Sequence, residues 1–208
     1  MFHNFAKYSH LYKRMFWTGS GAEYDRSEDI SCVKEDDILD HPIPRDQYGF
    51  EKYCIGRFID QSENIYNLRL FGIFGPYEFA ERRFISSMIL DAIHCTNFCI
   101  RQNSRFDYLW IGDFLHIMNL FIRKDNLSFH TYNVASGKSF ELLELAKIVK
   151  TVTKSVGDII IQNDGMGKEY TVNISRLMNQ FPDLKFSSID SSIDQFYQWY
   201  LERNMPSV

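Results

Sequence analysis

The chain has 208 residues and a formal net charge of -4, with 23 Lys and Arg against 27 Asp and Glu. Hydrophobic residues make up 45% and charged residues 24%, a globular balance that excludes a mainly disordered chain. No Lys/Arg block stands out, so we expect no nucleic-acid partner. The apolar runs fall short of the ~20 residues that span a bilayer, and no signal-peptide core occurs. We therefore expect no membrane partner and a cytoplasmic location.

The four cysteines and six histidines show no metal-ligand spacing. Cys95 and Cys99 are the closest pair of cysteines, and they flank an apolar stretch. A disulfide framework of the secreted type is also absent. We expect reduced, mostly buried thiols and no metal site.

In chain order, the first predicted element is a helix over 2–14, because its apolar residues have helical spacing. A short buried strand over 15–18 ends at Gly19-Ser20-Gly21, and the acidic, Pro-containing stretch 25–46 predicts a long loop. The remaining predicted elements are a helix over 46–61, a strand over 64–71, a helix over 78–94, strands over 98–101 and 106–111, a helix from its cap Asp113 to Arg123, a strand over 131–135, a helix capped by Ser139, a strand over 158–162 and helices over 172–180 and 190–203.

Strands that alternate with helices predict α/β architecture with parallel pairing. A doubly wound dinucleotide-binding fold begins with a strand, a glycine-rich turn and a helix, whereas this chain opens on a predicted helix. The spacing G-x-G-x-x-G does not occur in it. Gly165-Met166-Gly167 comes late and is interpreted as a turn.

Three residues form a candidate catalytic set. Ser20 lies in a glycine-flanked turn after a strand, and Tyr48 and Lys52 lie four apart on a predicted helix. Residues at i and i+4 share one helical face, so the phenol and the ammonium can point into the same cleft. An ammonium beside a phenol favours the phenolate, which suits a Tyr that moves a proton at a carbinol or carbonyl oxygen. A Ser hydroxyl can hydrogen-bond the same oxygen.

The order of these segments resembles the extended short-chain dehydrogenase/reductase superfamily, in its NAD-dependent epimerase/dehydratase branch acting on nucleotide sugars. The similar segments, in order, are TGSGAEYD (18–25), YGFEK (48–52), NLRLFGIFGP (67–76), FDYLWIGDF (106–114) and YNVASGKSFELLELAKIV (132–149). The resemblance implies catalytic roles for Ser20, Tyr48 and Lys52. It also implies NAD or NADP as cofactor, held by Tyr48, Lys52, Leu70 and Phe71.

The resemblance further implies substrate contacts from Tyr24, Gly72, Arg82, Arg83 and Arg105. Gly72 stands where the family usually has Asn, and Phe106 stands where it often has a phosphate-binding Arg. Arg105 is out of register by one residue, and Arg82, Arg83 and Arg101 are the alternatives for the diphosphate.

The residues after Ser20 narrow the set of reactions that the resemblance implies. The family's 4,6-dehydratases carry an acidic pair there, whereas this chain has Gly21 and Ala22. The Cys and His that serve inversion at C3 and C5 are matched by Ala22 and Tyr77. The resemblance therefore implies hydride transfer at one sugar carbon, as C4 epimerisation or keto-sugar reduction, in the synthesis of surface polysaccharide precursors.

The expected fold is a partial Rossmann-like parallel sheet, made of the later strands only, with a small carboxyl-terminal α/β lobe. We place the Rossmann-like part over 1–76 and the substrate-binding lobe over 77–208, with 113–135 returning to the sheet. We expect the cofactor to bind only if the missing amino-terminal half is supplied. The alternative is a non-catalytic remnant or a partner-dependent subunit.

The expected assembly is a homodimer through the helices over 2–14 and 46–61. Their apolar side chains offer the surface for such a contact; they are Phe2, Phe5, Tyr8, Tyr12, Tyr53 and Phe58. The strand over 15–18 would be an unprotected sheet edge in the lone chain, so we also expect poor solubility or partner dependence.

Overall fold

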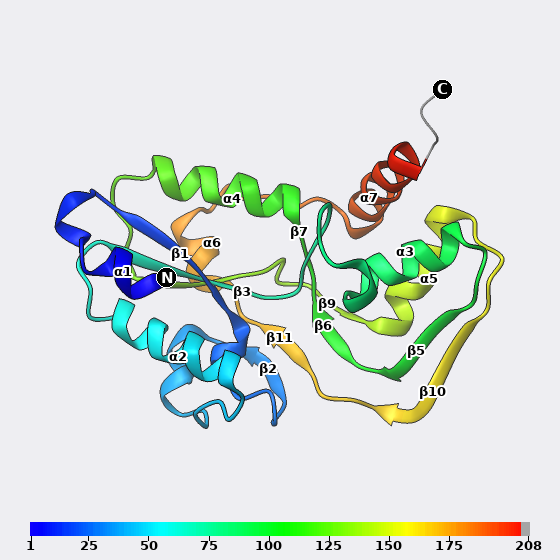
Figure 1. The fold of residues 1–208 in the computed structure, drawn as a ribbon, viewed down its shortest axis with the longest axis horizontal. Helices are drawn as coiled ribbons and strands as arrows, with labels where there is room; N and C mark the ends of the chain where they lie inside the picture. Colours follow the sequence, from blue (N-terminus) through cyan, green and yellow to red (C-terminus); the bar gives the residue numbers. More distant parts are fainter. Residues whose placement is uncertain (205–208) are drawn as a thin grey trace.

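The computed structural model describes residues 1–204. A three-stranded parallel sheet in the order β1-β3-β8 forms one end of the molecule (Figure 1), from β1 (Met15–Ser20), β3 (Ile65–Leu70) and β8 (Thr131–Val134). Pairing runs in register from Met15 opposite Ile65 to Ser20 opposite Leu70. The carboxyl ends of these strands therefore meet at one edge of the sheet.

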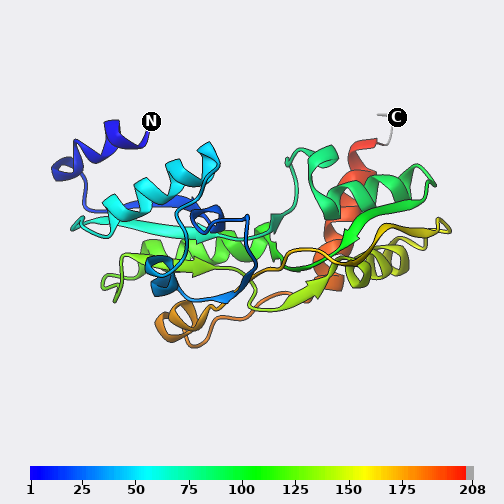
Figure 2. The same cartoon turned by 90° about the horizontal axis from the view of Figure 1, so that it is seen from below.

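Helices cover both faces of this sheet (Figure 2). On one face α1 (Phe2–Ala6) and α2 (Gln47–Ile59) pack on a core that includes Ile65, and on the other α4 (Ile111–Arg123) and α6 (Ser175–Gln180) pack on a core that includes Leu68. Successive strand residues point to opposite faces, so the apolar residues of β3 serve both cores. Such a parallel sheet is normally buried between two helical layers.

The other end of the molecule has its own core. It is built by α3 (Phe84–Ile93), α5 (Leu142–Thr153), α7 (Ile189–Asn204) and the parallel pair of β5 (Phe98–Asn103) with β10 (Ile159–Met166). The buried residues of this core are Phe74, Ile85, Met88, Ile89, Ala92, Phe98, Ile100, Ala146, Val149, Ile193 and Phe196. Helix α5 supplies Ala146 and Val149 to this core.

Two small sheets lie between these ends. The larger has the order β2-β11-β6-β9, from β2 (Ile30–Val33), β11 (Tyr170–Val172), β6 (Arg105–Asp107) and β9 (Ser139–Glu141), with β6 and β9 antiparallel. The smaller pairs β4 (Ile73–Phe74) with β7 (Leu109–Trp110). Segments far apart in the sequence thus meet beside the end of the first sheet.

The predicted α/β fold with a parallel, Rossmann-like sheet is confirmed. Several boundaries differ. The helix predicted over 2–14 is a short α1 followed by the 3₁₀ turn η1 (Ser9–Leu11), and the predicted loop 25–46 contains β2 and the 3₁₀ helix η3 (Glu35–Leu39). The division of the chain at 76/77 stays a prediction.

The two predicted helix caps are wrong. Helix α4 begins at Ile111, and Asp113 in its first turn accepts hydrogen bonds from the backbone N–H and hydroxyl of Ser187. Ser139 lies in β9, and α5 follows Glu141. In both cases a short strand pairs directly before the helix, and tertiary pairing overrides the local capping signal.

The cysteines are free thiols, and all four are exposed, so the prediction of mostly buried thiols is wrong. Gly165, predicted in a turn, lies in β10 at an irregular stretch of its pairing, with φ of 78°. Within residues 1–204 no helix is long and apolar enough to cross a membrane. Over the same residues no group of three or more His, Cys, Asp or Glu side chains is placed to hold a metal ion.

Asp107 ties β6 to the turn after β8. Its buried carboxyl group accepts hydrogen bonds from the Ser136 N–H at 2.9 Å, the Ser136 hydroxyl at 2.6 Å and the Gly137 N–H at 2.9 Å. Burial raises the pKa of Asp107 to about 6, although the hydrogen bonds with Ser136 and Gly137 act to lower it. The folded chain therefore holds this proton more tightly than the unfolded chain.

Stability should consequently depend on pH through Asp107. The group's contribution is fully present below pH ~4 and is lost as the pH rises through about 6. We expect the free energy of unfolding in urea to fall by up to about 3 kcal/mol from this group between those values. Asp107→Asn should flatten the profile, and the exposed control Asp125→Asn should not. An unchanged slope in Asp107→Asn would contradict the assignment.

Candidate active site

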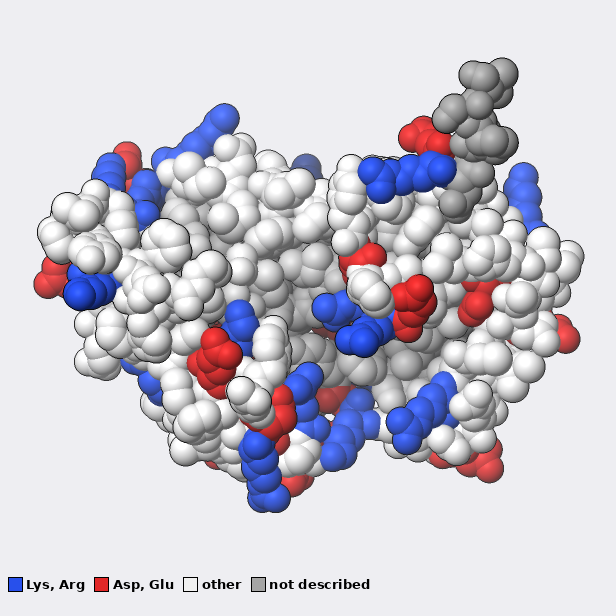
Figure 3. All heavy atoms as spheres, in the orientation of Figure 1, with Lys and Arg blue, Asp and Glu red and all other residues white. Residues whose placement is uncertain are grey.

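A cleft of about 800 Å³ opens at the carboxyl ends of β1 and β3, where the first sheet meets the rest of the molecule. Figure 3 shows charged side chains of both signs around the hollow between the two halves. The cleft brings together most of the residues that the sequence singled out: Ser20, Tyr48, Lys52, Leu70, Phe71, Gly72, Arg82 and Arg83. Ligands bind at this edge of open parallel sheets in general.

Ser20 ends β1 and begins the 3₁₀ turn η2 (Gly21–Glu23). Its Oγ accepts a hydrogen bond from the Ala22 N–H at 3.1 Å, while the Glu23 carboxylate accepts one from the Ser20 N–H at 3.4 Å. This reciprocal capping box fixes the backbone of the turn. The Ser20 hydroxyl is held at the edge of the cleft as a result.

Tyr48 and Lys52 lie on α2, whose first turn is capped by Asp46 accepting from the Gly49 N–H at 2.9 Å. Gly49 allows this helix to approach the Ser20 turn, because a Cβ there would lie 2.6 Å from the Ala22 carbonyl oxygen. Close packing of α2 against the Ser20 turn thus requires the glycine of YGFEK. It lets the helix present Tyr48 and Lys52 beside Ser20.

The Lys52 ammonium sits at the end of β1. Its Nζ donates to the Thr18 carbonyl oxygen at 3.1 Å and lies 5.6 Å from the centre of the Tyr48 ring and 4.7 Å from that of Trp17. The Tyr48 side chain is 51% exposed, so its hydroxyl is available to a ligand in the cleft. Tyr48 and Lys52 therefore lie on the same face of α2, as predicted.

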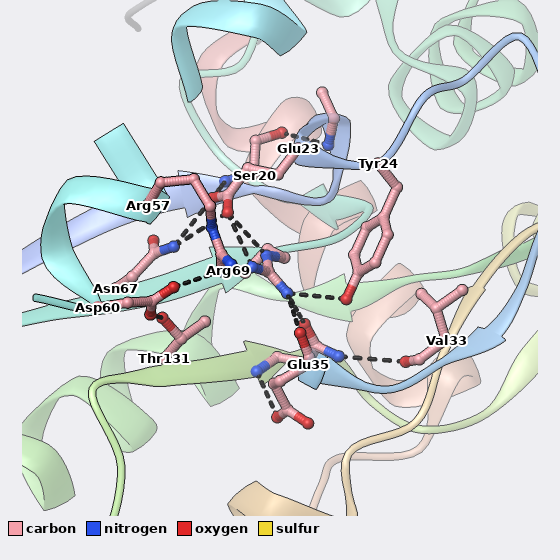
Figure 4. A network of polar contacts seen from close by, with 12 residues as sticks. Ser20, Glu23, Tyr24, Val33, Glu35, Arg57, Asp60, Asn67, Arg69 and Thr131 are labelled. Atoms are coloured by element: carbon pink, nitrogen blue, oxygen red, sulfur yellow. Dashed lines mark hydrogen bonds and ion pairs between the residues drawn. The ribbon is translucent and has the colours of Figure 1, made fainter. Parts of the chain in front are cut away.

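A buried ion pair lies beneath the Ser20 turn (Figure 4). Arg69 Nε donates to Glu23 at 2.9 Å, and both side chains are almost fully buried. The Asn67 amide also donates to Glu23 at 3.0 Å, and Arg69 donates to the Tyr24 hydroxyl at 2.7 Å. Since Glu23 also caps Ser20, the network connects the middle of the sheet to the catalytic candidate.

Two of the predicted substrate contacts do not line the cleft. Tyr24 is fully buried and donates to the Lys34 carbonyl oxygen at 2.7 Å, away from the cleft; burial raises the pKa of Tyr24 to about 12, although Arg69 acts to lower it. Arg105 lies outside the cleft and pairs with Glu141 at 3.6 Å. The alternative Arg101 is an exposed residue of β5 that also lies outside the cleft.

Gly72 lines the cleft with φ of 27°, and a Cβ there would lie 2.1 Å from the Asp107 carbonyl oxygen. A larger residue has no space at this position, because the Leu109 N–H donates to the Gly72 carbonyl at 3.1 Å and holds the two segments together. The Asn that the family usually carries cannot be accommodated here without a backbone shift. Gly72 contributes backbone only to the site.

Several lining residues were not found from the sequence. Tyr170, Lys168 and Glu169 come from β11 and the segment before it, which pairing with β2 and β6 brings to the cleft. The Lys168 ammonium donates to the Ser27 carbonyl oxygen. The remaining charged residues of the lining that the sequence did not indicate are Arg26, Glu28 and Glu78. Such contacts between distant segments leave no local sequence signal.

Cations outnumber carboxylates in the lining. The cations are Arg26, Lys52, Arg82, Arg83 and Lys168, and the carboxylates are Glu28, Glu78 and Glu169. Burial raises the pKa of Glu78, although the hydrogen bond that it accepts from the Ser86 hydroxyl acts to lower it. The cleft therefore suits an anionic ligand.

The sequence model of the NAD dependent epimerase/dehydratase family matches residues 4–135, which include Ser20, Tyr48, Lys52 and the Arg69 network. The chain belongs to this family. No curated protein matches the chain by sequence at a significant level.

Solved structures share the fold at low identity. The UDP-N-acetylglucosamine 4-epimerase of Methanobrevibacter ruminantium M1 is 19% identical, with a TM-score of 0.73, and the match covers 92% of this chain and 64% of that one. The dTDP-glucose 4,6-dehydratase of Bacillus anthracis str. Ames, in complex with NAD, is 17% identical, with a TM-score of 0.72 and coverage of 92% and 62%. The GDP-mannoheptose C4 reductase of Campylobacter jejuni, with NADP bound, is 13% identical, with a TM-score of 0.72 and coverage of 91% and 70%. This chain thus spans less than two thirds of the length of the first two of these proteins.

The Arg69–Glu23 pair should contribute strongly to the free energy of unfolding. Arg69→Met removes the cation and leaves the buried Glu23 carboxylate uncompensated, which typically costs 3–5 kcal/mol, so we expect a loss of about that size in urea unfolding. The control is Arg105→Met, which breaks a half-exposed pair with Glu141 and should cost no more than ~1 kcal/mol. Equal losses in the two variants would show that the buried network does not carry the stability assigned to it.

Proposed function

We propose that the protein is an NAD(P)-dependent nucleotide-sugar epimerase or keto-sugar reductase that transfers hydride at one sugar carbon, in the supply of surface polysaccharide precursors. The observation that carries the proposal is the meeting of Ser20, Tyr48 and Lys52 in one cation-lined cleft. Hydride transfer at one sugar carbon requires these three groups from the protein.

The residues of the cleft fit a nicotinamide dinucleotide. Lys52 uses one of its three N–H donors on Thr18 and has no second hydrogen-bond partner among residues 1–204, so donors remain for ribose hydroxyls. Tyr48, Leu70 and Phe71 line the same part of the cleft. The bound dinucleotide would supply the hydride acceptor and donor. Because the sequence contains no G-x-G-x-x-G, we propose that cofactor binding needs residues beyond these 208.

Each catalytic side chain has a defined task in this proposal. Tyr48 acts as the phenolate when it takes the proton of the sugar hydroxyl at the reacting carbon, and the resulting phenol returns that proton when the carbonyl is reduced. The Ser20 hydroxyl hydrogen-bonds the same oxygen and stabilises the charge that develops there. The Lys52 ammonium, 5.6 Å from the Tyr48 ring centre, supplies positive charge beside the Tyr48 side chain during the transfer.

The charged lining supports a nucleotide diphosphate as the anionic part of the substrate. Arg82 and Arg83 follow each other at the end of the 3₁₀ helix η4 (Ala80–Arg82), across the cleft from β1. We assign diphosphate binding to these two residues. Guanidinium groups suit phosphate oxygens because they donate in a planar fork.

The turn after Ser20 supports single-carbon hydride chemistry over dehydration. Gly21 and Ala22 offer no acid, and a Cβ on Gly21 would lie 2.2 Å from the Tyr170 hydroxyl and 2.5 Å from the Phe71 ring. An acidic side chain at position 21 therefore has no room in this cleft. This favours the epimerase and the reductase over a dehydratase that would need an acid there.

Tyr48→Phe should lower turnover by about 10²–10⁴-fold, because it removes a positioned acid/base. The assay uses a panel of nucleotide sugars with NAD(H) or NADP(H) and this chain together with a dinucleotide-binding fragment of a family member. Stability should change little, since Tyr48 is half-exposed. Tyr66→Phe, on β3 and outside the cleft, is the matched control and should keep full activity. Activity that survives Tyr48→Phe unchanged would end the catalytic assignment.

We also propose a homodimer through the surface formed by α1, η1 and α2. Phe5 and Leu11 are 56% and 71% exposed there, and Tyr8 and Phe58 are about half-exposed. The structure corrects one expected member of this surface: Phe2 is buried within the chain against Trp17 and Phe58. Exposed apolar side chains in one area favour a partner surface.

The dimer should dissociate when this surface is made charged. We expect sedimentation velocity to show a dimer for the unmodified chain and a monomer for the double variant Phe5→Asp, Leu11→Asp. The control Leu39→Asp changes an equally exposed leucine on η3 and should leave the dimer intact. A monomeric unmodified chain at micromolar concentration would contradict the proposal.

A further inference from the structure

The segment over residues 75–83 joins β4 to α3 and carries Arg82 and Arg83 to the cleft. It contains the turn η4, in which the Arg82 N–H donates to the Phe79 carbonyl oxygen at 3.0 Å. This bond is local to the turn, so it fixes the shape of the turn and leaves its position to other contacts. The direction of the two guanidinium groups therefore depends on what holds the segment from outside.

Tyr77 has a backbone conformation that needs such support. Its φ is 70°, in the left-handed region that residues other than glycine rarely adopt. Burial does not hold the residue there, because it is 79% exposed. A side-chain contact from another part of the chain is therefore needed to keep this conformation.

Arg203 of α7 supplies that contact. Its guanidinium carbon lies 4.7 Å from the centre of the Tyr77 ring and 4.6 Å from that of Trp199. Its Nη2 also donates to the Tyr77 hydroxyl at 3.3 Å, and the two rings lie 5.3 Å apart, edge to face. A guanidinium within about 6 Å of two aromatic rings is attracted to both. The three side chains thus form one stack.

The stack connects the segment to a fixed part of the molecule. Phe196 of α7 is fully buried in the core of that end, and Trp199 packs against this core. Glu78, directly after Tyr77, accepts a hydrogen bond from the Ser86 hydroxyl of α3. Two consecutive residues of the segment are therefore tied to two different helices.

The tied residues lie close to the cations of the cleft. Arg82 follows Tyr77 by five residues, and its guanidinium carbon lies 5.4 Å from the centre of the Phe79 ring, so its direction follows the backbone of the segment. Tyr77 and Arg203 do not line the cleft themselves. An effect of Arg203 on a ligand there has to pass through the segment.

We propose that Arg203 is a positioning residue for anion binding: by holding Tyr77 it keeps the segment 75–83 in place, so that Arg82 and Arg83 face the same anion in the cleft. The inference rests on the proposed function, because that function gives the two arginines a diphosphate to bind. Affinity is higher when the donors are ordered before the ligand arrives. Arg203 itself does not touch the ligand.

The test measures binding of UDP, dTDP and GDP to the full chain by isothermal titration calorimetry. Arg203→Met should weaken the tightest of the three by about tenfold, the size that two exposed cation–π contacts set. Arg101→Met is the matched control, because it removes the same charge from an exposed position of β5 outside the cleft, and it should change Kd by less than about twofold. Equal losses in the two variants would indicate a long-range effect of charge and would overturn the positioning role.

A double-mutant cycle tests whether Arg203 acts through Tyr77. Tyr77→Leu should weaken binding by about the same factor, and Arg203→Met should cause no further loss in that background. Inorganic pyrophosphate, which is the diphosphate alone, should lose the same factor, while the urea midpoint stays unchanged because Arg203 is exposed. Arg203→Lys keeps the charge without the planar group that stacks on the rings, so it should restore only part of the affinity.

The kinetic arm uses a two-part assembly of this chain with a dinucleotide-binding fragment of a family member. Arg203→Met should raise KM and leave kcat within about twofold, because the diphosphate is held alike in the ground state and the transition state. A fall in kcat with KM unchanged would contradict a role in diphosphate binding.

The two proposals fail in different ways. Binding of a nucleoside diphosphate that Arg82→Met weakens, and that Arg203→Met changes no more than Arg101→Met does, would overturn the role of Arg203 and leave the substrate class intact. Absence of binding of all three nucleoside diphosphates to the unmodified chain would overturn the proposed nucleotide-sugar function. A loss with Arg203→Met that disappears in the Tyr77→Leu background would support the positioning role.

Discussion

The buried pair of Arg69 and Glu23 is the interaction on which the site depends. Two charges out of water are tolerated only when they are paired and hydrogen-bonded, and here Asn67 donates to Glu23 while Arg69 donates to the Tyr24 hydroxyl. Glu23 also accepts from the Ser20 N–H, so the carboxylate that compensates the charge of Arg69 also shapes the turn that carries Ser20. The same carboxylate therefore supports both the fold of the sheet and the position of Ser20.

The architecture explains why residues so distant in sequence share one cleft. Parallel strands place Ser20 and Leu70 side by side at their carboxyl ends, and Gly49 brings α2 close enough for Tyr48 and Lys52 to join them. The opposite wall is assembled from separate segments that carry Arg82 and Lys168. The sheet thus supplies the candidate catalytic groups, and the rest of the chain supplies cationic charge for an anion.

Local patterns were enough to predict the α/β class, the helix of YGFEK and the meeting of Ser20, Tyr48 and Lys52, because strand order and i,i+4 spacing determine them. They were not enough for Tyr24, whose burial follows from its bond to Arg69, or for Arg105, which pairs with Glu141. Tyr170 was missed because only the pairing of β11 with β2 and β6 brings it to the cleft. The two helix-cap errors have the same cause, since the short strands β7 and β9, formed by distant pairing, precede α4 and α5.

Isotope labelling at the reacting carbon tests directly whether hydride passes between the sugar and the nicotinamide. Nucleotide sugars deuterated at C4 are incubated with the two-part assembly and oxidised dinucleotide, and the nicotinamide is analysed by mass spectrometry and NMR. We expect deuterium to appear on the nicotinamide ring when a substrate is oxidised, and this transfer to be lost with Tyr48→Phe. Conversion of the sugar with deuterium released to water, or retained without any passage through the dinucleotide, would contradict it.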